Sequence, residues 1–174
     1  MTKTLTHTLA SPIGPVTLVE KDGALVELRF GATRSVDGPG PETDVVRAFN
    51  RFSAGDLGAL DAIPVAPEGT PFQKRVWEEL RRIPPGTTIS YAELAARIGR
   101  PTATRAVAAA NGANPVAIVV PCHRVIAKDG TLHGYGGGLP AKKKLLEHEG
   151  LEVSGDVVRT ILFSPPGRET PPAR

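Results

Sequence analysis

The alternation of apolar and polar positions predicts extended structure at the start of the chain. Residues 6–9, 14–19 and 24–30 are rich in β-branched and apolar side chains, and the turn signal Lys21-Asp22-Gly23 separates the last two stretches. These stretches predict a small antiparallel sheet. Apolar residues at helical spacing then predict a helix over 44–52.

The pattern becomes helical after a Gly-, Pro- and Ala-rich linker at 55–69, in which a short strand is expected around 62–65. Thr70-Pro71 is a good start for a helix over 72–83. A second helix is expected after Ser90, ending at Gly99-Arg100-Pro101. Thr102 is the expected cap of a third helix over 103–111. This spacing is typical of a helix-turn-helix, although helical hairpins also occur in proteins that do not bind DNA.

The C-terminal third predicts a small wing and one more helix. Lys128-Asp129-Gly130 is a turn between extended pieces, and a last helix is expected over 142–148 with Gly150 beyond its end. The lysines at 142–144 are interpreted as a solvated helix face, with phosphate contact as the weaker alternative. The predicted organisation is a support domain with linker at 1–69, a winged-helix-like domain at 70–156, and a Pro-rich, partly mobile tail at 157–174.

Composition limits the class of protein. The chain has 174 residues, of which 40% are hydrophobic and 22% charged, as in globular proteins. No apolar run reaches the roughly 20 residues of a membrane span, and the N-terminus lacks the apolar core of a secretory signal. Its one cysteine, Cys122, excludes an internal disulfide and a multi-thiolate metal site. We therefore expect a cytoplasmic protein that does not bind membranes.

Charge is divided unevenly along the chain. Residues 1–71 carry 6 Lys/Arg against 9 Asp/Glu, a net −3, whereas residues 72–174 carry 15 against 9, a net +6. A positive second part suits a polyanionic partner such as nucleic acid, and an uneven but ordinary surface would give the same numbers.

Cys122 stands at the end of an apolar run and directly before His123 and Arg124. A lone cysteine is most often an inert core residue. A nearby imidazole or cation favours the nucleophilic thiolate, although neighbours on an extended segment face opposite ways. The pair of Cys122 and His123 alone is therefore compatible with an inert core cysteine and with a nucleophile.

The segment from Asn114 to Val125, with the sequence Asn-Pro-Val-Ala-Ile-Val-Val-Pro-Cys-His-Arg-Val, closely resembles the active-site signature of the O6-alkylguanine-DNA alkyltransferases. The resemblance extends from Phe72 to Gly150, and residues 1–69 resemble the family only loosely, through Ser11-Pro12-Ile13-Gly14-Pro15. The further landmarks, in the family's order and spacing, are Tyr91, Arg105, Tyr135-Gly136-Gly137-Gly138 and Leu145-Leu146-Glu147-His148-Glu149-Gly150.

The resemblance implies a nucleophile, a base and an orienting residue. Cys122 would take the alkyl group from O6 of guanine, with His123 as its base through a water and Glu149 orienting the imidazole. Asn114 would hold the active-site turn. The thioether product resists hydrolysis, so each molecule would act once. No metal or other cofactor is expected.

The resemblance also implies how DNA is bound. The damaged base would be flipped out of the duplex, with the third helix in the minor groove. Arg105 would replace the base in the stack, and Tyr91 would crowd the backbone and later donate a hydrogen bond to the base. Ala103 and Ala106 would be small residues that face the groove, and Tyr135 would form a wall of the pocket. The backbone of Cys122, Val125 and Gly136 would recognise the guanine edge. Some relatives have serine at position 136 and proline at 117, where this chain has glycine and alanine.

The resemblance finally implies an α+β chain. A ribonuclease-H-like sheet-and-helix domain would precede a helical, winged-helix-like domain. The partner would be double-stranded DNA carrying O6-alkylguanine, and O4-alkylthymine remains open as a second lesion. The protein would be a monomer in solution, with cooperative binding on DNA left open.

Two alternatives of other classes remain. One is a non-catalytic alkyltransferase-like protein that binds lesions, a class that lacks the cysteine and commonly has tryptophan there. The other is a helix-turn-helix transcription regulator with a structural cysteine. Cys122 itself argues against the first alternative.

Overall fold

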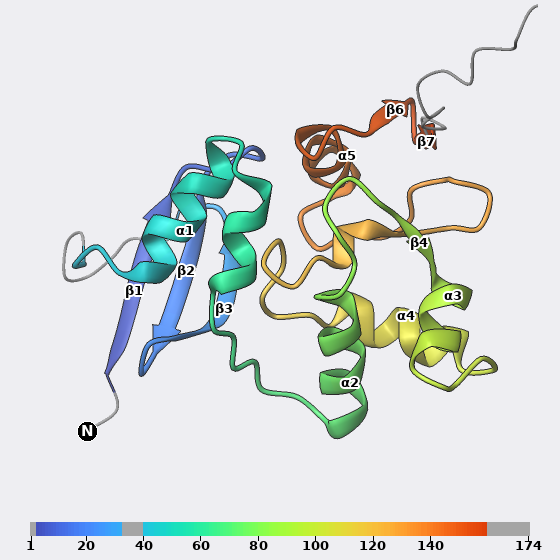
Figure 1. Cartoon of the computed structure of the whole chain (residues 1–174), viewed down its shortest axis with the longest axis horizontal. Helices are drawn as coiled ribbons and strands as arrows, with labels where there is room; N and C mark the ends of the chain where they lie inside the picture. The colour runs from blue at the N-terminus through green and yellow to red at the C-terminus, as the bar shows by residue number, and fades with distance from the viewer. Residues whose placement is uncertain (1–2, 33–39, 160–174) are drawn as a thin grey trace, which may run out of the picture.

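The N-terminal part is built around an antiparallel sheet with the strand order β1-β2-β3. The computed structural model describes residues 3–32 and 40–159 (Figure 1). The strands are β1 (Thr4–Leu9), β2 (Val16–Lys21) and β3 (Ala24–Phe30). Asp22 and Gly23 both have positive φ angles, of 51° and 85°, as a tight two-residue hairpin turn requires. The predicted sheet and its turn are confirmed.

One helix covers a face of this sheet (Figure 1). Helix α1 (Asp44–Ser53) begins at the Thr43 cap and turns Phe49 and Phe52 into the core. A 3₁₀ turn, η1 (Leu57–Ala62), follows. The strand expected around 62–65 is reduced to a single bridge between Leu25 and Val65.

Three helices carry the second part, as predicted. Helix α2 (Pro71–Leu80) begins with a capping box formed by Thr70 and Gln73, and α3 (Tyr91–Arg97) is capped by Ser90. Both pack against α4 (Thr104–Gly112).

One predicted helix cap is wrong. Ala103, and not Thr102, occupies the N-cap of α4, and no side chain caps the helix there. The chain is still turning at Thr102, so its hydroxyl comes too early to reach the first free amides of α4.

The remaining elements are short and surround the site described below. They are β4 (Ile89–Ser90), the 3₁₀ turn η2 (Cys122–Arg124), β5 (Val125–Ile126), α5 (Leu139–His148), β6 (Glu152–Ser154) and β7 (Val157–Arg159). Strand β4 pairs in parallel with β5, and β6 pairs antiparallel with β7. The expected tail is therefore wrong for 157–159, which form a strand. Its remainder, 160–174, lies outside the described residues.

A single hydrophobic core joins the two parts. Its buried side chains extend from Val16 in β2 to Leu145 in α5, and a smaller cluster around Leu146 and Val158 lies under the last hairpin. The arrangement of helices and sheets is α+β, as predicted. Within 3–32 and 40–159, no helix has both the length and the apolar character needed to cross a bilayer.

We expect Leu80→Ala to lower the free energy of unfolding by about 2–5 kcal/mol, because it opens a cavity in this core. Leu80 is fully buried, and Trp77, the single tryptophan of the chain, lies on the same helix. Urea unfolding followed by Trp77 fluorescence measures the change. Glu78→Ala, an exposed substitution on α2, is the matched control and should stay within about 0.5 kcal/mol of the wild type. Equal midpoints for the two variants would contradict the core assignment.

Candidate active site

Asn114 closes the irregular loop that leads to Cys122. Its side-chain amide donates to the Val120 carbonyl (2.7 Å), and its side-chain oxygen accepts from the Val116 amide (3.0 Å). Ile118 has a φ angle of +76°, a strained value for a β-branched residue. Asn114 therefore satisfies backbone groups that no regular secondary structure pairs. The loop ends at η2, where Cys122 is buried.

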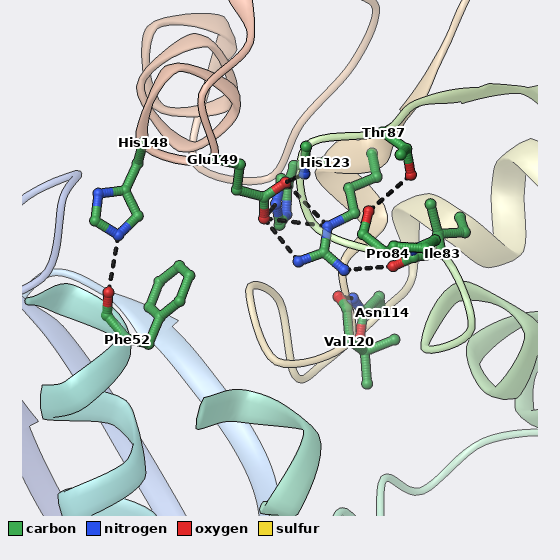
Figure 2. A network of polar contacts seen from close by, with 11 residues as sticks. Phe52, Ile83, Pro84, Thr87, Asn114, Val120, His123, His148 and Glu149 are labelled. Atoms are coloured by element: carbon green, nitrogen blue, oxygen red, sulfur yellow. Dashed lines mark hydrogen bonds and ion pairs between the residues drawn. The ribbon is translucent and has the colours of Figure 1, made fainter. Parts of the chain in front are cut away.

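A buried carboxylate ties this turn to the end of α5 (Figure 2). Glu149 Oε1 lies 2.8 Å from His123 Nε2, and Arg124 approaches the same carboxylate with Nε (3.0 and 3.1 Å) and Nη2 (2.7 Å). The Gly86 amide donates to Oε2 (3.2 Å). Gly86 has a φ of +74°, and a Cβ there would lie 3.1 Å from the Glu149 carbonyl oxygen, so the position requires glycine.

Burial leaves His123 neutral in spite of its contact with Glu149. Burial lowers the pKa of His123 more than the hydrogen bond and charge of Glu149 raise it. Burial alone would raise the pKa of Glu149, but its contacts with His123 and Arg124 outweigh burial and lower that pKa to about 2. A carboxylate can only accept, so Nε2 of the neutral imidazole carries the proton. Nδ1 is then a buried acceptor, and it makes no hydrogen bond to any residue that the structure describes.

The Cys122 thiol is protonated at rest and needs a base. Burial raises its pKa, and a hydrogen bond from Asn114 and the charge of Lys142 oppose this rise only in part. A thiol of this kind is nucleophilic only after its proton is removed. The free Nδ1 of the neighbouring imidazole is an acceptor suited to that task.

An open pocket of ≈ 650 Å³ adjoins the cluster. Tyr91, from the start of α3, and Tyr135, from the loop before α5, are among its lining residues, together with Gly136. Burial, and after it the nearby Cys122, raise the pKa of both tyrosines. The Tyr135 ring stands edge-on to that of His123, with 6.4 Å between centroids. The pocket therefore brings together Tyr91, Tyr135 and Gly136, which were predicted from separate parts of the sequence.

Helix α4 presents its predicted contact residues to the surface. Arg105 and Ala106 are exposed, and Ala103 is half-buried. Arg105 makes no hydrogen bond or ion pair with any residue in 3–32 or 40–159, so its side chain is available to a partner. The same helix borders the pocket through Ala108 and Asn111.

The comparisons with known proteins agree on one family. Residues 71–151 match the family model described as 6-O-methylguanine DNA methyltransferase, DNA binding domain. A methylated-DNA–protein-cysteine methyltransferase of Shigella flexneri is 41% identical over 170 residues, which cover 86% of this chain and 98% of that protein. The chain belongs to the methylated-DNA–protein-cysteine methyltransferase family. This confirms the family and the enzyme class expected from the sequence.

Solved structures of relatives support the fold. The O6-methylguanine methyltransferase of Mycobacterium tuberculosis superposes with a TM-score of 0.72 at 43% identity, covering 84% of this chain and 93% of that one. The Mycobacterium tuberculosis OGT in complex with DNA gives a TM-score of 0.71 at 44% identity, covering 83% and 91%. The α+β fold is thereby confirmed.

The position of Lys142 contradicts the predicted solvated helix face at 142–144. It is fully buried, and Nζ donates to the carbonyls of Val125 and His133, each at 2.7 Å. Burial lowers its pKa to about 8. The solvated-face prediction is therefore wrong for Lys142, although Lys144 is exposed. Its helical spacing from Leu145 and Leu146, which are both buried, is the signal that would have placed it inward.

Two further residues of the site were not predicted. Besides its contacts with Glu149, Arg124 donates through Nη1 to the Ile83 carbonyl (2.5 Å) and is almost fully buried. Asn111, on α4, points its side-chain amide at the Cys122 carbonyl (3.5 Å). A buried arginine two residues after a candidate nucleophile is a signal only once its acidic partner is known. Asn111 gave no signal within its alanine-rich helix.

The described residues contain no group of three or more His, Cys, Asp or Glu side chains that could hold a metal ion.

We expect Glu149→Gln to change how stability depends on pH. The pKa of Glu149 falls from the usual 4.5 to about 2 on folding. Its contribution to stability is therefore fully present above pH 4.5 and is lost as the pH falls towards 2. That contribution is on the order of 3 kcal/mol. Glu149→Gln should also lower stability at neutral pH by about 3–5 kcal/mol, because Arg124 is left buried without its counterion.

Denaturant unfolding at several pH values measures both effects. Glu147→Gln, an exposed substitution on the last turn of α5, is the matched control and should follow the wild-type curve. His123, whose pKa burial lowers, also destabilises the folded state as the pH falls below 6.5, so the contribution of Glu149 is taken from the difference between the variant and wild-type curves in the segment below pH 4.5. If Glu149→Gln keeps the wild-type slope in that segment, the carboxylate does not carry this charge in the folded state.

Proposed function

We propose that this protein repairs DNA by transferring an alkyl group from O6 of a damaged guanine to Sγ of Cys122, once per molecule. The observation that carries the proposal is a buried Cys122 followed directly in the chain by a neutral His123 whose Nδ1 makes no hydrogen bond to any residue that the structure describes. Membership of the methylated-DNA–protein-cysteine methyltransferase family supports the same chemistry.

Each atom of the cluster has a place in the reaction. His123 Nδ1 takes the thiol proton of Cys122 through a water, and Glu149 stabilises the imidazolium that results. Sγ attacks the alkyl carbon, and the carbon–O6 bond breaks with its electron pair passing to the guanine. The guanine then takes up a proton and becomes an ordinary base. Water does not cleave the new thioether, so Cys122 stays alkylated.

The pocket would receive the lesion. Cys122 does not line it, but the lining residue Asn111 contacts the Cys122 carbonyl. O6 lies at the base-pairing edge, so the nucleotide must leave the duplex, at a cost of a few kcal/mol. Tyr91 would crowd the DNA backbone and donate a hydrogen bond to the base, and Tyr135 would wall the pocket. The backbone of Cys122, Val125 and Gly136 would read the guanine edge. The Val125 carbonyl already accepts from Lys142 Nζ (2.7 Å), and a carbonyl oxygen can accept a second hydrogen bond.

Helix α4 would bind the minor groove. Exposed Arg105 would enter the stack in place of the flipped base, while the small Ala103 and Ala106 allow close approach of the helix. Residues 71–151 match a DNA-binding domain, and the positive charge of the chain lies in the part that contains them. Phosphate contacts rather than base readout would supply the affinity.

The proposal also covers the roles of the two parts of the chain, the oligomeric state and the location of the protein. Residues 1–69 would serve as a support domain, and residues 70–156 would carry both DNA binding and chemistry. The protein would act as a monomer inside the cell, where its DNA substrate is found. A non-catalytic lesion-binding role is disfavoured, because such proteins lack the cysteine that this chain has.

The mass of the protein tests the transfer directly. After incubation with duplex DNA containing O6-methylguanine, we expect intact-mass measurement to show a gain of one methyl group on the wild type and none on Cys122→Ser. Peptide mapping should place the methyl on Cys122. An unchanged mass in folded wild-type protein would contradict the proposed function.

Arg105→Ala tests the role of α4. Because Arg105 is exposed and outside the pocket, its removal should slow repair of duplex DNA by about 10-fold or more, if it supports the flipped state by the few kcal/mol that flipping costs. Its reaction with free O6-alkylguanine base should stay unchanged. Arg100→Ala, another exposed arginine near the turn before α4, is the control for lost charge. An equal loss on duplex and free base would exclude the inserting role.

A further inference from the structure

The N-terminal sheet reaches the wall of the candidate pocket through one side chain. Phe30, the last residue of β3, stands edge-on to Tyr135, with 5.6 Å between ring centroids and 66° between planes. It also lies against the two glycines after Tyr135. A Cβ on Gly137 would be only 2.9 Å from Phe30 Cε1, and one on Gly136 would be 3.3 Å from Cε2. The ring therefore occupies the space where these residues have no side chains.

Phe30 is held in place by its own domain. It pairs with Val16 in the β2–β3 ladder. The next residue, Gly31, donates its amide to the Pro15 carbonyl (2.9 Å), and its carbonyl accepts from Thr17 Oγ1 (3.0 Å). Even so, 38% of Phe30 is exposed, and Val157 is the only other large hydrophobic residue so exposed among those that the structure describes. Phe30 is therefore a partly exposed apolar ring at the end of a strand, and the loop around Tyr135 is the neighbour against which it packs.

Tyr135 depends on such packing because its hydroxyl does not anchor it. The buried Tyr135 hydroxyl makes no hydrogen bond to any residue of the described ranges. Its backbone stands among glycines at 134 and 136–138, which restrict the chain little. Lys142 fixes the His133 carbonyl on one side, and the Gly138 amide closes a turn onto the Tyr135 carbonyl (2.9 Å) on the other. Between these points, the rings of Phe30 and His123 are the two aromatic neighbours that set where the Tyr135 ring stands.

We propose that Phe30 is a positioning residue for the alkyl pocket: by bracing Tyr135 from the N-terminal sheet, it fixes the pocket width and so limits the size of the adduct that Cys122 accepts. This inference rests on the proposed function. It gives the N-terminal part a share in specificity, although Phe30 itself does not touch the reacting atoms. Without the ring, the glycine-flanked loop can withdraw, which harms the placing of a small alkyl group and makes room for a large one.

The test compares two adducts in one DNA context. Second-order rate constants are measured for wild type and Phe30→Ala with duplexes containing O6-methylguanine or O6-benzylguanine, each normalised to the active fraction found by intact mass. In Phe30→Ala the ratio of the benzyl to the methyl rate constant should rise by about 10-fold, the discrimination typical of a small change in an apolar pocket. Phe30→Leu, which keeps an apolar contact, should give an intermediate ratio.

A matched control separates positioning from stability. Val157→Ala removes the other exposed apolar residue, which lies on β7 and does not line the pocket. Its ratio should equal that of the wild type. If Phe30→Ala lowers both rate constants by one factor, or lowers the ratio, Phe30 does not set the pocket width. If wild-type protein gains no methyl group at all, the proposed function fails, and this result is separate from the failure of the Phe30 inference.

Discussion

The site depends on one buried ionic contact, the carboxylate of Glu149 shared between Arg124 and His123. A lone buried anion next to an imidazole would draw a proton onto that imidazole. Arg124 supplies the positive charge instead, with Gly86 donating a further hydrogen bond. Burial is the main reason that the pKa of His123 falls, and the charge of Arg124 lowers it further, while Glu149 fixes the tautomer with the acceptor lone pair on Nδ1. Arg124 thus helps to keep His123 in the neutral form that can accept a proton, although it need not touch a substrate. It also offsets the unfavourable position of an anion at the C-terminal end of α5.

Polar contacts of buried side chains also hold the irregular backbone around Cys122. Three backbone carbonyls around the site accept hydrogen bonds from side chains. Arg124 donates to Ile83, Asn114 to Val120 and Lys142 to Val125. Each is buried or partly buried, so its hydrogen bonds are costly to lose. These contacts hold the loop within the hydrophobic core, to which Cys122 itself belongs.

What the sequence predicts well is local, and what it misses is long-range. The sheet, the hairpin turn at Asp22 and helices α2 and α3 follow from alternation, periodicity and caps within a few residues. The helical spacing of Lys142 from Leu145 and Leu146 indicates burial, but the two carbonyls that make a buried lysine possible lie 17 and 9 residues away and are not visible in the sequence. Arg124 was missed because its partners lie 25 and 41 residues away. The pairing of His123 with Glu149 came from resemblance to a family, since no spacing rule connects positions 26 residues apart.

The N-terminal part is more than a separate support, because it contacts the neighbours of site residues. The Leu28 amide of β3 donates to the carbonyl of Pro115, the residue after Asn114 (2.8 Å). His148, the residue before Glu149, bonds through Nε2 to the Phe52 carbonyl of α1 (2.8 Å), as Figure 2 shows. Both contacts are made to segments whose own geometry is irregular or terminal, where the backbone has few other restraints. A shift of the sheet or of α1 would therefore move the Asn114 turn and the end of α5 together. Since the thiol and its base are held by those two segments, their relative placement is a property of the whole chain and not of residues 71–151 alone.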